Sequence, residues 1–363
     1  MGDDVFAKGP QAMRKLIWLV VILTLAYGGY WFMGARKIEA GAQAMVSQAR
    51  SEGWGDAKSV SLAGFPSRFD LTFDEPQLTG GDGLWHWQAP FAQLFALGYR
   101  PNEVIAYLPS GQELDIGDRS YRLDLADMRA SARVSYSPAL PLEDAVAVLS
   151  KPVLIPKTGS TPEVSADQIR LAISREDKAQ GALGSSASAS DLVMPGAAYR
   201  LGAEAVNLTL PPEIAQDLET KAGLPTTLAR LHFDAVTGLQ APITRAALQR
   251  GLPGVMTFSL SDLSLSWGGN DLSAKGDLRI DASGYPEGTI EIRSASWRKW
   301  VEVAQKLGLI GQDEVKVVTS VGTMLAAQDP GNAVTVPLIF QNGMMRLGPI
   351  PLGAAPQLPV QRQ

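Results

Sequence analysis

The chain has 363 residues, a formal net charge of −5, two histidines and no cysteine. Without cysteine it can form no disulfide, thiol nucleophile or cysteine–metal site, and two histidines cannot build a histidine-rich metal centre. No excess of basic residues is present to bind nucleic acid, so we exclude nucleic acid as a partner.

The first predicted element is a single transmembrane helix. Residues 16–35 are uncharged, lie between Lys15 and Arg36, and are long enough to cross ~30 Å of hydrocarbon. Aromatic residues at 27, 30 and 31 fall near the far interface, where amphipathic rings prefer to lie. We therefore interpret 16–35 as a signal anchor with these anchoring side chains: Leu16, Ile17, Trp18, Leu19, Val20, Val21, Ile22, Leu23, Leu25, Tyr27, Tyr30, Trp31 and Phe32.

Two other interpretations of this segment are weaker. A cleaved signal peptide would need a small residue shortly before the break, but the best site, near Gly34-Ala35, has Met33 at that position. A buried core helix does not suit so apolar a segment at a terminus.

The charges that flank the span do not orient it. Three basic residues come before it and three after it: Lys8, Arg14 and Lys15, then Arg36, Lys37 and Arg50. The short N-terminal segment and the Arg14–Lys15 pair favour residues 1–15 as a cytoplasmic tail, with the large remainder on the other side of the membrane.

A membrane-proximal helix and a β-hairpin are predicted next. Residues 36–55 repeat apolar side chains at helical spacing and end in glycines. In residues 58–73, Phe69 and Leu71 alternate with polar residues on the second strand of a hairpin. Trp85 and Trp87 flank His86, so we expect two core tryptophans and a surface histidine.

At this point the sequence resembles a known family. The apolar anchor is followed by VSLAGFPSRFDL and by WHWQAPFAQLFALGYRPN, and the chain closes with VPLIFQNGMMRLGPIPLGAAPQLP. This combination is similar to the DUF2125 family of uncharacterised alphaproteobacterial proteins. The resemblance implies a single-pass protein of the bacterial inner membrane, with the bulk of its chain in the periplasm, and it supplies no catalytic residues.

The rest of the chain is predicted to form two β-rich halves, 56–175 and 192–350. A flexible loop or linker, 176–191, separates them, and an extended tail, 351–363, follows. Helices are expected near 211–222, 297–307 and 312–327. A one-residue slip between Leu260 and Leu263 predicts a bulge near Ser261-Asp262. The strands from Leu272 onward resemble β-segments of AsmA-like envelope proteins.

The predicted fold class is therefore mainly β with a few helices (α+β). One transmembrane helix precedes large, antiparallel, curved β-sheets, with helices packed on them or capping them. Thirty-six glycines and 24 prolines suit many strands and turns. Whether the sheets form one β-domain or two stays open.

No pattern in the sequence predicts catalysis. The motifs of serine hydrolases, zinc proteases and P-loop proteins are missing. We interpret the pairs Asp124 with Asp127 and Glu143 with Asp144 as surface charges, and Gly80-Gly81-Asp82-Gly83 as a turn. An enzyme, a cofactor and a metal are therefore not expected.

Two non-enzymatic functions remain. In the first, an incompletely covered sheet face binds a lipid or other apolar ligand. In the second, the core is filled and the body is a scaffold for envelope proteins. An apolar cavity above ~300 Å³ near the membrane would favour the first. These residues are candidates for the groove or the core: Phe69, Leu71, Trp85, Trp87, Leu231, Phe233, Leu265, Trp267, Trp297 and Trp300.

Overall fold

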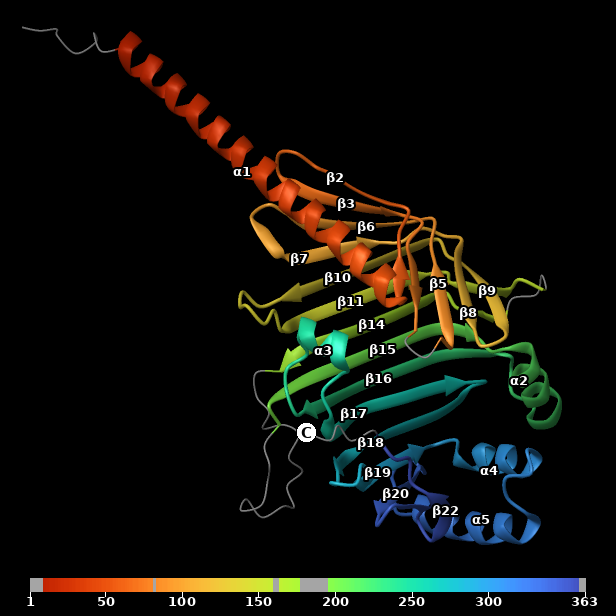
Figure 1. Cartoon of the computed structure of the whole chain (residues 1–363). Helices are drawn as coiled ribbons and strands as arrows, with labels where there is room; N and C mark the ends of the chain where they lie inside the picture. The colour runs from red at the N-terminus through yellow and green to blue at the C-terminus, as the bar shows by residue number, and fades with distance from the viewer. Residues whose placement is uncertain (1–8, 81–82, 159–162, 177–194, 359–363) are drawn as a thin grey trace, which may run out of the picture. The chain divides into compact units, whose positions relative to one another are not determined.

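A computed structural model describes residues 9–80, 83–158, 163–176 and 195–358 of the chain. Most of the described residues lie in antiparallel strands, and several helices accompany them (Figure 1), which confirms the predicted fold class. The chain divides into two compact units, Met1–Tyr107 and Leu108–Gln363.

The first unit combines one long helix, α1 (Gly9–Glu52), with short strands. β2, β3, β6 and β7 pair in that order as an antiparallel sheet, and β1, β4 and β5 pair beside them. The strands are β1 (Gly55–Asp56), β2 (Ser59–Ala63), β3 (Arg68–Asp74), β4 (Gln77–Thr79), β5 (Trp85–Gln88), β6 (Phe91–Leu97) and β7 (Arg100–Tyr107).

The second half of α1 packs on this sheet. Trp31, Ala35 and Ala42 recur at helical spacing and are buried against Phe69 and Leu71 of β3. The predicted membrane span and membrane-proximal helix are therefore one continuous helix. The end of the predicted span, from Trp31 onward, packs on the first unit because its apolar spacing matches the face of β3.

The second unit is an open, curved antiparallel sheet (Figure 1). β10, β11 and β14–β22 pair in that order, while β8, β9, β12 and β13 form a smaller set. The strands are β8 (Gln112–Ile116), β9 (Arg119–Asp124), β10 (Asp127–Val134), β11 (Leu142–Ser150), β12 (Val153–Pro156), β13 (Val164–Ser165), β14 (Gln168–Glu176), β15 (Ala197–Thr209), β16 (Thr227–Leu239), β17 (Val255–Trp267), β18 (Asn270–Ile280), β19 (Pro286–Ser294), β20 (Val334–Gln341), β21 (Met344–Leu347) and β22 (Ile350–Ala354).

Within its described residues, the second unit has helices at the three predicted places, near 211–222, 297–307 and 312–327, and one further short helix. They are α2 (Pro212–Asp217), which continues as a π-helical turn over Leu218–Ala222, then α3 (Arg245–Arg250), α4 (Trp297–Lys306) and α5 (Gln312–Ala326). Gly223 ends the first of them in the left-handed conformation, with φ +66°. The predicted bulge is also present, because the pairing of β17 shifts between Leu260 and Leu263.

Two predicted boundaries differ from the structure. Residues 177–191 of the predicted linker lie outside the described residues, but the strands on either side of it, β14 and β15, pair along the whole of β14. The two compact units divide at Tyr107–Leu108 instead. The predicted extended tail begins as a strand, since Ile350–Ala354 pairs with β21; residues 359–363 lie outside the described residues.

Candidate functional site

The predicted anchor residues form an exposed apolar segment of α1. Within the described residues, α1 is the one helix long and apolar enough to span a membrane. Most of the anchor side chains are exposed, from Leu16 to Phe32, as expected for a surface that faces lipid. Trp31 is the exception: it is 7% exposed and stacks on Phe69, with ring centroids 5.7 Å apart.

One face of the sheet in the second unit is apolar across nine strands, β10, β11 and β14–β20. Strand pairing places its side chains in three rows, which we call the apolar face. The first row is Met128, Leu149, Ile169, Ala205, Leu231, Leu265 and Leu272; the second is Ala130, Ala147, Leu171, Ala203, Phe233, Leu263, Ala274, Ile292 and Val336; the third is Ala132, Ala145, Ile173, Leu201, Ala235, Leu260, Gly276, Ile290 and Leu338. None of these described positions carries a polar side chain.

The opposite face of the same strands, the polar face, carries paired charges. Glu204 accepts from Arg230 with an N–O distance of 2.7 Å, and Arg200 binds Asp234 at 2.6 Å. His232 Nε2 lies 3.7 Å from Asp262. A depression of about 290 Å³ on this face is lined largely by polar and charged side chains. Over these three rows the two faces therefore differ in chemistry.

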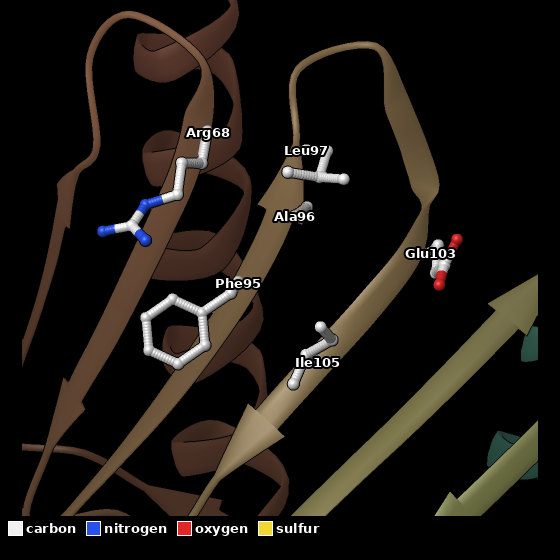
Figure 2. Close-up of a pocket in the computed structure, with 6 residues that line it drawn as sticks. All are labelled: Arg68, Phe95, Ala96, Leu97, Glu103 and Ile105. Atoms are coloured by element: carbon white, nitrogen blue, oxygen red, sulfur yellow. The ribbon is translucent and has the colours of Figure 1, made fainter.

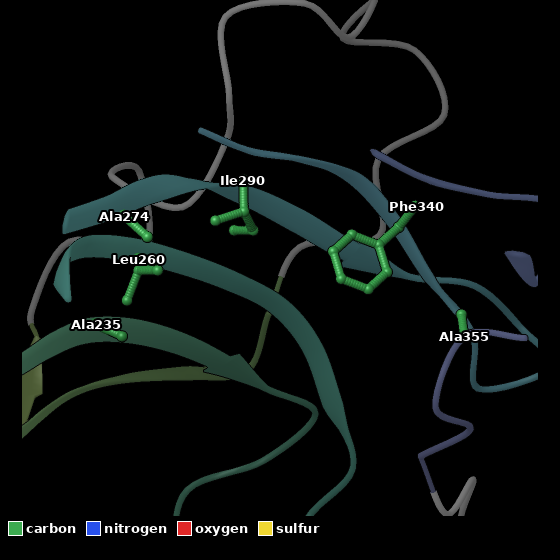
Figure 3. Close-up of a cluster of buried hydrophobic side chains, with 6 residues drawn as sticks. All are labelled: Ala235, Leu260, Ala274, Ile290, Phe340 and Ala355. Carbon is green, nitrogen blue, oxygen red and sulfur yellow. The ribbon is translucent and has the colours of Figure 1, made fainter. Parts of the chain in front are cut away.

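The apolar face is packed at one end of the sheet and open at the other. From β16 to β19 residues of the face are buried: Ala235, Leu260, Ala274 and Ile290 form one cluster with Phe340 of β20 and with Ala355, which follows β22 (Figure 3). None of the row positions on β10, β11 and β14 is buried, and Leu171, in the middle row on β14, is 49% exposed. A large aliphatic side chain of the apolar face is thus half in contact with solvent.

Side chains also close the ends of the longest strands. Near α3, Tyr199 is fully buried among Leu239, Ile243 and the half-buried Ile173. At the other end, α4 and the π-helical turn that follows α2 pack around Trp267 of β17.

The residues predicted to line a groove or a core lie in different parts of the fold. Leu231, Phe233 and Leu265 lie on the apolar face. Trp267 and Trp300 contact one another, with centroids 6.4 Å apart, and Trp297 is buried against α5 and β20, so these three tryptophans belong to the helix-capped end.

The remaining four candidates lie in the first unit. Phe69 and Leu71 are buried beneath α1. Trp85 is 41% exposed on β5 and is therefore not the core residue that the alternation predicts, while Trp87 is half-buried. The strands β4 and β5 have only three and four residues, too few to bury both faces of the hairpin. His86, predicted at the surface, is half-buried, and its Nδ1 lies 3.0 Å from Thr79 Oγ1.

A pocket of about 320 Å³ lies on the first unit's sheet, on the face away from α1 (Figure 2). Phe95 and Ile105 are paired across β6 and β7 and form its floor with Leu97. Arg68 and Glu103 also line it; the Arg68 guanidinium binds Asp70 at 2.8 Å and lies 5.9 Å from the centre of the Phe95 ring. Apart from Arg68 and Glu103, its lining residues are apolar.

The acidic pairs noted in the sequence are held by neighbouring arginines. Asp124 binds Arg122, and Asp127 binds Arg129. Glu143 and Asp144 bind Arg175 and Arg133 in the same way. Ser264, which faces His232 across the strands, donates to Asp262 at 3.4 Å rather than to the histidine. No cluster of potential metal ligands occurs within the described part of the chain.

Sequence reasoning missed the side chains that make the apolar face continuous. Leu171 and Ile169 alternate visibly along their strand, but only the pairing of β14 with β11 and β15 shows which residues share their face. The pocket residues Arg68, Phe95 and Ile105 were also missed. Leu94 and Phe95 are neighbours in an apolar run. The sequence therefore does not indicate which of the two side chains faces away from α1.

Comparison with protein families yields one match and agrees with the resemblance noted in the sequence. Residues 31–356 match the family described as "Uncharacterized protein conserved in bacteria (DUF2125)". No curated protein matches the chain. Because the match covers the second half of α1 and nearly all of both units, the chain belongs to the DUF2125 family.

Proposed function

We propose that this protein is a non-enzymatic lipid-binding protein of the bacterial cell envelope. α1 anchors it in the inner membrane, the two units lie in the periplasm, and the apolar face of the second unit binds an acyl chain. The observation that carries the proposal is the open part of that face, around Leu171.

The chemistry of the open part of the apolar face suits an apolar ligand. Adjacent strands are ~4.8 Å apart, so its three strands, β10, β11 and β14, present a patch about 10 Å across. Each methylene group that such a ligand buries contributes about 0.8 kcal/mol. A ligand with polar groups along its length would leave them unpaired, because none of the row positions can donate or accept a hydrogen bond through its side chain.

The anchor supports a lipid as the ligand. A body tethered by α1 stays next to a supply of lipid, whereas a body that binds a soluble ligand gains nothing from this position. The pocket beside Arg68 is a second apolar surface of the same kind, with a guanidinium group at its edge.

The test is to purify the full chain from membranes and to identify co-purifying lipids by mass spectrometry. The decisive variant is Leu171→Asp, which places a charge on the open part of the apolar face. Because Leu171 is 49% exposed, the variant is expected to fold. It should carry at least ~10-fold less lipid, a loss of about 1.4 kcal/mol or more of binding free energy.

The matched control is Ala172→Asp, which adds the same charge at the next residue, on the polar face. It should retain the lipid of the natural chain. A natural chain without lipid that binds another envelope protein tightly would favour the scaffold. Equal lipid loss in the two variants would place the ligand elsewhere.

A further inference from the structure

Two turns of the first unit carry exposed apolar side chains. Residues 64–67 join β2 to β3, and residues 98 and 99 join β6 to β7; we call these turns, together with Leu97 at the end of β6, the tip. Phe65 is 59% exposed and Tyr99 70%, and Leu97 is also exposed. Apolar and aromatic residues at the ends of strands are costly in water but suit a boundary with lipid.

Side chains of α1 fix the tip at one level along the helix. The Tyr27 hydroxyl donates to the carbonyl of Pro66 at 2.8 Å, and Trp31 Nε1 donates to the carbonyl of Arg68 at 3.0 Å. The Trp31 and Phe65 rings lie edge to face at 5.2 Å. Figure 1 shows the β2–β3 and β6–β7 turns beside α1, where the helix leaves the sheet. The tip is therefore level with residues 27–31.

The exposed part of α1 is shorter than a bilayer is thick. From Leu16, the first residue after Lys15, to Tyr30, the last before the buried Trp31, it has fifteen residues. These span about 22 Å of helix, against ~30 Å of hydrocarbon. With Lys15 at one boundary of the hydrocarbon, the other boundary lies about 8 Å beyond Tyr30, so the tip, level with residues 27–31, lies on the membrane side of that boundary.

The backbone of the tip is suited to a setting with little water. Gly98 N donates to the carbonyl of Ser67 at 2.9 Å, and Arg68 N donates to the carbonyl of Gly64 at 3.1 Å. Together with the bonds from Tyr27 and Trp31, these contacts satisfy groups that would otherwise need water, as lipid-facing structure requires. Exposed Arg36 and Arg100 lie close by in the sequence and can reach lipid phosphates.

We propose that the tip inserts into the boundary between headgroups and acyl chains of the membrane that α1 spans. The inference rests on the proposed anchorage by α1. It adds a second membrane contact, so that the first unit is held against the bilayer by its turns as well as by its helix.

The absence of cysteine allows a direct test, because one introduced cysteine is the only thiol in the chain. The full chain is reconstituted in vesicles of phosphatidylethanolamine and phosphatidylglycerol that contain lipids with a nitroxide near the headgroup and lipids with a nitroxide midway along the acyl chain. Single variants Tyr99→Cys, Ile22→Cys and Leu84→Cys are labelled with bimane, and quenching by the nitroxide is measured. Leu84 is the matched control, an exposed apolar residue at the β4–β5 turn of the same unit.

The expected result is strong quenching at positions 22 and 99 and weak quenching at position 84. Quenching at 22 with position 99 as weak as position 84 would overturn the tip proposal and leave the anchor intact. Weak quenching at position 22 would overturn the anchor and the tip proposal together.

Discussion

Asp329 lies in the connection between α5 and β20 and binds neighbouring groups through its carboxylate. Its carboxylate binds Arg293 at 2.5 Å and accepts a hydrogen bond from Gly331 N at 2.8 Å. These contacts, the Arg293 hydrogen bond first, lower the pKa of Asp329 from 3.8 to about 2. The folded state therefore favours the ionised form of this residue.

The pKa of Asp329 predicts a dependence of stability on pH. A carboxyl group whose pKa is lower in the folded state stabilises the fold above its unfolded pKa and loses that effect as pH falls through the folded value. Asp329→Asn should therefore lower Tm at pH 6, and the difference from the natural chain should shrink between pH 3.8 and about 2.

Thermal unfolding at several pH values measures this effect. Asp313→Asn is the control, because Asp313 is fully exposed and pairs with Lys316 one turn away on α5. A Tm difference for Asp329→Asn that is constant from pH 6 to pH 2 would contradict the assignment.

At the scale of elements, α1 has an exposed apolar segment and also forms part of a core. Trp31 and Phe32 are neighbours in sequence, yet the first is buried against Phe69 and the second is exposed. Trp31→Ala should destabilise the packing of α1 on the sheet by about 3–5 kcal/mol, the range for a large aromatic residue replaced in a core. Phe32→Ala should change it by less than about 0.5 kcal/mol.

Hydrogen exchange of the β2 and β3 amides in the full chain reports on this packing. Loss of protection in Trp31→Ala but not in Phe32→Ala is the predicted pattern. Equal protection in both variants would show that the sheet does not depend on α1.

The contact between α4 and α5 depends on a glycine. A Cβ atom at Gly322 would lie 2.5 Å from the ring of Trp297, which is itself buried. Gly322→Ala should therefore destabilise the second unit by about 1–2 kcal/mol, because overpacking exceeds the gain in helix propensity. The control is Ser320→Ala, at an exposed position of α5, which should not destabilise the unit in this way. Denaturant unfolding in detergent compares the stabilities of the two variants. A Gly322→Ala variant more stable than the natural chain would contradict this packing.

The strands and helices of the second unit were largely predictable, but the site was not. The slip between Leu260 and Leu263 located a bulge, because alternation along one strand is a local signal. Which strands pair is not local. The candidate set therefore mixed Phe69, which lies under α1, with Phe233, which lies on the apolar face, although both alternate with polar neighbours.

For the whole molecule, the account predicts one orientation in the membrane. The basic residues on either side of α1 are balanced, so their charge alone does not decide it. With the N-terminus in the cytoplasm, a reporter enzyme that is active only in the periplasm should be active when fused after Gln363. The same reporter placed before Met1 should be inactive, and the reverse pattern would overturn the proposed location.

The central claim is that the apolar face of the second unit binds an acyl chain. The most direct measurement is photo-crosslinking in cells fed a fatty acid with a diazirine in its chain, followed by mapping of the modified residues by mass spectrometry. The account predicts crosslinks at alternate residues of β14, at Ile169, Leu171 and Ile173, and none at Arg170 or Ala172, which lie on the polar face. Crosslinks confined to α1, or spread equally over both faces of β14, would contradict it.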